Sequence, residues 1–99
     1  MQLREVAHAR AGDKGNLVTI SVIAWRAADY ARLEEQVTVE RVSAHFAELI
    51  DRPATRYCLP RLGALNIVLH RPLTQSVTRS LALDAHGKCL SSALLALEI

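Results

Sequence analysis

The chain has 99 residues, of which 51% are hydrophobic and 22% are charged, and its formal net charge is +2. This size and composition predict one globular domain over residues 1–99 and exclude a disordered polymer. The arginines are scattered without a basic block, so nucleic-acid binding is not expected, and no apolar run is long enough to span a membrane. No signal-peptide pattern follows Met1, so a cytoplasmic location is expected.

The first quarter of the chain is predicted to form a hairpin. Residues 3–10 alternate as a strand with His8 and Arg10 on one face and small alanines on the other, against which another element should pack closely. Residues 17–25 also alternate and are rich in β-branched types. We expect the two strands to pair antiparallel across a glycine-containing loop at residues 10–16.

A helical region is predicted over residues 28–50, where Ala, Leu, Glu, Arg and Gln dominate. The apolar stripe changes phase between Val37 and Val42, which indicates either two consecutive helices or one kinked helix. Thr38 is suited to cap the second helix, and Asp51-Arg52-Pro53 should end it.

The next elements are a strand and an ambiguous apolar run. Residues 54–59 are predicted to form a strand that Pro60 stops. Residues 61–73 fit either a short helix or a buried strand, and we favour the helix because residues 62–66 lack β-branched side chains.

The C-terminal part is predicted to form a second hairpin. Residues 78–84 and 88–98 flank a loop that contains Gly87, although the last run also fits a helix. This order of elements predicts an α+β fold, with an antiparallel sheet that carries its helices on one face. The other face is left to solvent or to a second subunit, and an assembly built on it through Ile23 and Trp25 is one possibility.

A polar loop is the strongest candidate site, and its residues are Arg10, Gly12, Asp13, Lys14, Gly15 and Asn16. Backbone N–H groups around glycines form concavities that bind anions, and Arg10 and Lys14 add positive charge. Asp13 could orient either cation or accept a proton. The same residues also suit a purely structural connection, so the pattern leaves both interpretations open.

Three further polar residues are secondary candidates. His8 lies near the loop and suits either acid–base chemistry or a structural hydrogen bond. Asn66 and His70 are four residues apart, so on a helix they would face one pocket. No metal or cofactor is expected, because the His and Cys residues are spread singly without the spacing of metal ligands.

Three blocks of sequence resemble a known family. They are residues 9–16 (Ala-Arg-Ala-Gly-Asp-Lys-Gly-Asn), residues 59–69 (Leu-Pro-Arg-Leu-Gly-Ala-Leu-Asn-Ile-Val-Leu) and residues 77–84 (Val-Thr-Arg-Ser-Leu-Ala-Leu-Asp), followed by Gly87-Lys88. Nearly end to end, the chain resembles the C-terminal, ferredoxin-fold domain of the acyclic terpene utilisation A (AtuA) proteins. It departs at Thr19-Ile20-Ser21, where that family often has Asn-Ile-Gly.

The resemblance implies a ferredoxin-like α+β sandwich and a functional set made of Arg10, Asp13, Lys14, Asn66 and Arg79. In longer relatives this domain follows a much larger one that is linked to the degradation of terpenoid acyl-CoA compounds. The resemblance therefore implies a small accessory protein, not catalytic alone, that pairs with a larger subunit or forms a homo-oligomer. Its loop would bind an anionic small molecule. The alternative is a small enzyme or acyl-CoA-binding protein that uses Arg10, Asp13 and Lys14.

Overall fold

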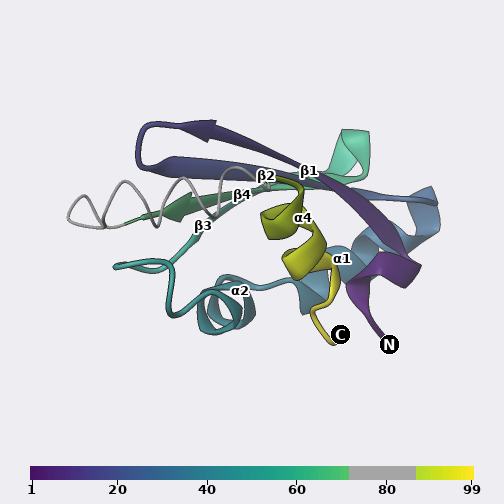
Figure 1. Ribbon diagram of the computed structural model, residues 1–99. Coiled ribbons are helices and arrows are strands. Elements are labelled where there is room, and N and C mark those ends of the chain that lie inside the picture. Colours follow the sequence, from purple (N-terminus) through teal and green to yellow (C-terminus); the bar gives the residue numbers. More distant parts are fainter. Residues whose placement is uncertain (72–86) are drawn as a thin grey trace.

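The computed structural model describes residues 1–71 and 87–99 and shows an α+β fold (Figure 1). The elements in chain order are η1 (Leu3–Glu5), β1 (Ala7–Lys14), β2 (Leu17–Ala24), η2 (Ala27–Asp29), α1 (Tyr30–Gln36), α2 (Val39–His45), β3 (Thr55–Leu59), η3 (Pro60–Leu62), β4 (Ala64–His70) and α4 (Gly87–Leu95), where η is a 3-10 helix. The strands lie in the order β1-β2-β4-β3, and every neighbouring pair is antiparallel. In Figure 1 the helices α1, α2 and α4 lie on one side of the sheet, which confirms the predicted architecture.

The core lies between the sheet and its helices. On the central strands β2 and β4, every second side chain is buried in this core, namely Val18, Ile20, Val22, Leu65, Ile67 and Leu69. Each helix adds a fully buried residue, namely Leu33, Val42 and Leu94. On β1, Ala9 and Ala11 pack against this core, and their short side chains allow α4 to lie against the strand. The expected close packing on the alanine face is therefore confirmed.

The predicted break in the helical region is also confirmed. α1 ends at Gln36, and the Thr38 hydroxyl caps α2 by accepting a hydrogen bond from the backbone N–H of Arg41 at 3.2 Å. One residue of the sheet, Arg56, stabilises the C-terminal end of α1. The Arg56 guanidinium on β3 donates to the carbonyl oxygens of Glu34 at 2.7 Å and Val37 at 2.8 Å. A cation at a helix C-terminus is favourable because the last carbonyls have no helical partner.

Two predicted boundaries are wrong in the first half. The first strand is Ala7–Lys14 rather than residues 3–10, because η1 occupies the start of the chain and the register with β2 continues to Lys14. α2 ends at His45 and not near Asp51, because the chain turns back toward β3. The hydroxyl of Ser43 fixes this turn by accepting a hydrogen bond from the N–H of Ala54 at 2.9 Å.

Two predicted element types are wrong in the second half. The run at 61–73 contains strand β4 instead of a helix, because it lies between β2 and β3 and alternates buried and half-buried residues. The run at 88–98 is largely helix α4 instead of a strand; Leu90 and Leu94 bury one helical side, and Leu97 is buried just after the helix. The predicted strand at 78–84 lies outside the described residues.

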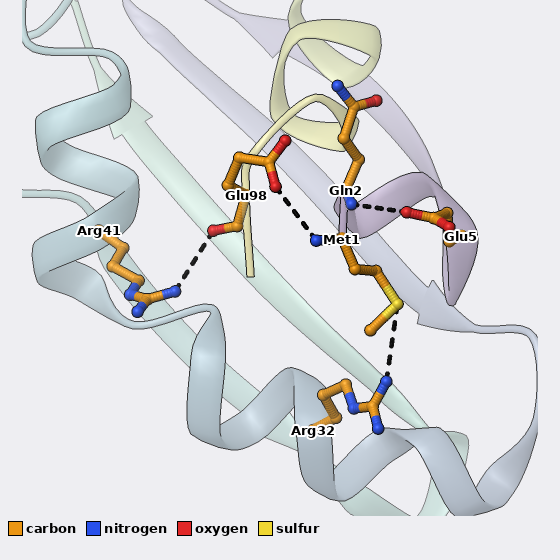
Figure 2. A network of polar contacts seen from close by, with 6 residues as sticks. All are labelled: Met1, Gln2, Glu5, Arg32, Arg41 and Glu98. Atoms are coloured by element: carbon orange, nitrogen blue, oxygen red, sulfur yellow. Dashed lines mark hydrogen bonds and ion pairs between the residues drawn. The ribbon is translucent and has the colours of Figure 1, made fainter.

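The two ends of the chain pair with each other beneath the helices (Figure 2). The N–H of Leu3 donates to the carbonyl of Leu97 at 2.9 Å, and the N–H of Ile99 donates to the carbonyl of Met1 at 2.8 Å. An ion pair joins the Met1 amine to the Glu98 carboxylate at 3.2 Å. None of the helices in the described residues has the length and apolarity needed to cross a membrane.

Candidate functional site

The face of the sheet opposite the helices, here called the open face, carries a polar row across all four strands. Arg10 of β1 lies opposite Ser21 of β2, Ser21 lies opposite Asn66 of β4, and Asn66 lies opposite Tyr57 of β3. We call these four residues the central row. Neighbouring strands are about 4.8 Å apart, so an extended Arg10 side chain on β1 is long enough to lie over the neighbouring strand β2. The Ser21 hydroxyl lies 3.5 Å from the Asn66 amide oxygen, which is a long hydrogen bond.

A second cation lies nearer the turn of the first hairpin. Lys14 lies opposite Leu17, and Leu17 lies opposite His70. His70 shares the open face with Asn66, as expected, but a strand separates positions i and i+4 by about 13 Å. The two residues therefore flank a surface instead of lining one small pocket.

The predicted loop at 10–16 is mostly strand. Only Gly15 and Asn16 connect β1 to β2, and Gly15 has a left-handed φ of 64° whereas Gly12 does not. Gly12 stays in register with Thr19, so it is not a turn residue. The expectation of a glycine-rich loop is therefore wrong for residues 10–14.

Arg71, which sequence reasoning did not single out, holds the turn. It is only 5% exposed, and its guanidinium donates to the carbonyl of Gly15 at 3.2 Å. Its backbone N–H donates to the carbonyl of Asn16 at 2.8 Å, and the Asn16 amide lies 3.5 Å from the carbonyl of Arg71. The side chain after β4 thus fixes the end of the first hairpin. An arginine between His70 and Pro72 gives no sequence signal for this role.

The strand alternation separates Asp13 from the two cations. Asp13 lies opposite Val18, on the side of the sheet that faces the helices, while Arg10 and Lys14 lie on the open face. His8 shares the open face and stacks against Trp25, with ring centroids 4.4 Å apart. The remaining candidate, Arg79, lies outside the described residues.

Tyr30 lies on the helical side of the sheet near the end of β3. Burial of its hydroxyl raises the pKa of Tyr30 above 10.0, and the nearby Cys58 and Glu34 raise it further, whereas Arg56 opposes them. Cys58 is an exposed free thiol. Within the described residues, no three His, Cys, Asp or Glu side chains gather closely enough to hold a metal ion.

Comparison with known proteins identifies a family. The family model of the AtuA ferredoxin-like domain matches residues 1–99, which is the whole chain. No curated protein and no solved structure gives a significant match.

Proposed function

Because the chain belongs to the AtuA ferredoxin-like domain family, we propose that it is an accessory binding domain that is not catalytic alone. In this proposal the open face holds an anionic small molecule, and the domain works with a larger subunit or a second copy in the degradation of terpenoid acyl-CoA compounds. The central row is the observation that supports it, because it aligns Arg10, Ser21, Asn66 and Tyr57 across four strands.

The chemistry of the central row suits a carboxylate or phosphate group. The guanidinium of Arg10 can donate two parallel hydrogen bonds to such a group. The Asn66 amide and the Tyr57 hydroxyl add neutral donors. At the described strand positions of the open face there is no Asp or Glu that would compete for Arg10. Lys14 supplies a second positive charge on the same face.

The framework that carries these groups is rigid. Ser21 and Asn66 belong to the two central strands, whose opposite sides are buried in the core. Rigid elements reduce the entropy that side chains lose on binding a ligand. The Gly-Asp-Lys-Gly segment therefore contributes through Lys14 and through its position on β1, rather than as a free loop.

The test is a thermal-shift titration with inorganic phosphate, short carboxylates and CoA. A ligand that binds only the native state raises the unfolding midpoint by mass action. We expect the shift to be lost in Arg10→Ala and reduced in Asn66→Ala. It should persist in Arg52→Ala, which removes an exposed arginine that pairs with Asp51 away from the central row. Equal shifts in all four proteins would contradict the site.

A second candidate function is binding or turnover of an acyl-CoA by Arg10 and Lys14 of the open face, without Asp13, which lies on the other side of the sheet. It is favoured by the next row of the open face, where Ile23 and Leu59 place apolar surface beside the central row. This surface could cover an acyl chain while Arg10 holds an anionic group. A larger thermal shift with a long acyl-CoA than with CoA would favour this binding mode. Turnover that is lost in Arg10→Ala would favour an enzyme.

A further inference from the structure

Large apolar side chains gather at one end of the sheet. Of the five that are exposed in the described residues, four lie here, namely Trp25 (62% exposed), Tyr57 (55%), Leu59 (39%) and Leu62 (71%). We call these four residues the apolar end. The N–H of Ala24 donates to the carbonyl of Gly63 at 2.9 Å, which brings the end of β2, and with it Trp25, next to η3. Beside them, residues 58–62 line a hollow of about 470 Å³.

Trp25, Tyr57 and Leu62 each leave more than half of their surface exposed, so that part of each side chain does little for the fold. Soluble proteins rarely expose contiguous apolar surface unless it contacts a partner. Trp, Tyr and Arg are also the residues that dominate binding energy at protein interfaces. The apolar end offers all three types, since Arg26 follows Trp25 directly and Arg61 lines the hollow.

The charged residues that directly neighbour Trp25 and Leu62 in the chain are arginines, Arg26 and Arg61, while Glu5, beside the Trp25 backbone, accepts a hydrogen bond from the N–H of Gln2 at 2.8 Å. Segments 14–28 and 52–71, which supply its residues, contain arginine and lysine but neither Asp nor Glu. A second copy docked face to face would place Arg26 and Arg61 against their own counterparts, and such like-charge contacts are costly. A surface with carboxylates around an apolar centre would instead complement both features.

We infer that the apolar end docks a different protein, through an apolar segment of that protein flanked by Asp or Glu. In the complex Trp25 and Leu62 pack against the apolar residues of the partner, and Arg26 and Arg61 pair with its carboxylates. The inference rests on the accessory role proposed above. Tyr57 borders both surfaces, but the docking contacts of Trp25, Leu62, Arg26 and Arg61 do not include the anion-binding residue Arg10.

Trp25 makes this inference measurable, because it is the single tryptophan of the chain. The probes are two synthetic amphipathic peptides with identical apolar residues, one flanked by Glu and the other by Lys. We expect the Glu peptide to shift the Trp25 emission to the blue and to protect it from acrylamide quenching. Its affinity should fall with added salt, because the charges lie at an exposed rim. The Lys peptide should do neither.

Variants locate the surface. Leu62→Ser should weaken the Glu peptide by roughly tenfold or more. The double variant Arg26→Glu with Arg61→Glu should reverse the preference and bind the Lys peptide. Arg52→Glu is the matched control, since it reverses an exposed charge beyond the apolar end and should change nothing.

Each of the other outcomes overturns the inference. Equal binding of both peptides would mean that charge does not select the partner, and binding of neither would mean that the surface does not dock such a segment. A blue shift of the protein alone that grows with concentration, with a dimer mass by light scattering, would make a second copy the occupant. Loss of Glu-peptide binding in Arg10→Ala would likewise mean that the peptide occupies the anion site and not the apolar end.

Discussion

The hairpins β1-β2 and β3-β4 both turn at a glycine with positive φ, but different side chains surround the two turns. Each connection contains a left-handed glycine, Gly15 with φ 64° between β1 and β2, and Gly63 with φ 62° between β3 and β4. The first connection is held by the buried Arg71, which donates to the carbonyl of Gly15. The second leaves Leu62 exposed to solvent. The first hairpin is thus stabilised from within the fold, while the second exposes an apolar side chain.

The buried guanidinium of Arg71 holds the turn between β1 and β2 in its conformation. A guanidinium removed from water is costly unless acceptors surround it, and turn carbonyls are suitable acceptors. Arg71 and the Gly15-Asn16 turn therefore satisfy each other, and neither is expected to tolerate change alone.

Removal of Arg71 should have the largest effect. We expect Arg71→Ala to lower the free energy of unfolding by about 2–3 kcal/mol, because it deletes a charge-assisted hydrogen bond and the packing of a buried side chain. Arg61→Ala is the matched change in the second hairpin. It should cost less than about 0.5 kcal/mol because Arg61 is exposed. Urea denaturation measures both, and equal losses would abolish the contrast between the hairpins.

Alanine at the two left-handed glycines should cost about 1–2 kcal/mol each, since the Cβ strains that backbone conformation. In both Gly15→Ala and Gly63→Ala the added Cβ meets open space, so only the backbone matters. Gly12→Ala also meets open space but lies in strand β1, and we expect a change within about 0.5 kcal/mol. If Gly12→Ala proved as costly as Gly15→Ala, Gly12 would have a structural role that its strand geometry does not explain.

The hydroxyl of Tyr30, near the end of β3, should lose its proton at a higher pH than a tyrosine in the unfolded chain. In a Tyr57→Phe background Tyr30 is the remaining tyrosine, and its absorbance should give a midpoint above pH 10 because burial raises its pKa. A raised folded pKa contributes stability that is full below the unfolded pKa near 10 and is lost as the pH rises through the folded pKa. Tyr30→Phe should remove this alkaline loss. Titration at the value of the urea-unfolded protein would show that the hydroxyl is not shielded.

Change at the exposed leucine of the second hairpin should have the smallest effect on stability. We expect Leu62→Ser to alter the free energy of unfolding by less than about 0.5 kcal/mol, because the side chain is 71% exposed. Leu69→Ala is the buried counterpart near the first turn and should cost about 2–5 kcal/mol. A large loss in Leu62→Ser would indicate that this leucine supports the fold instead of serving a partner.

The hydrophobic pattern predicts an element correctly where it fits only the period of a strand or only that of a helix. The β-branched alternation of β2 has a single interpretation, which is confirmed. The change of phase before Thr38 predicts a break, either between two helices or within a kinked one, and the structure has two helices. The run that became β4 fits two periods, because Leu62, Leu65 and Leu69 suit a helix while Leu65, Ile67 and Leu69 suit a strand. Its position between β2 and β3 decides the outcome, and sequence spacing does not encode that position.

The candidate site shows the same limit. Arg10, Lys14 and Asn66 were selected by residue type, and the register places all three on the open face. Ser21 and Tyr57 join them only through strand pairing, which links residues far apart in the sequence. Arg71 was missed because its role depends on a turn that lies 56 residues from it.

The pairing of the chain ends gives the fold an uncommon freedom of connectivity. Since the N–H of Ile99 donates to the carbonyl of Met1, a short linker could join the two ends and new ends could be opened elsewhere. A circular permutant opened at Gly63 would cut a connection for which the structure gives no hydrogen bond from a buried side chain of residues 1–71 or 90–99. One opened at Gly15 would separate Arg71 from its acceptor. We therefore expect the fold to accept new chain ends at the Gly63 turn but not at the Gly15 turn.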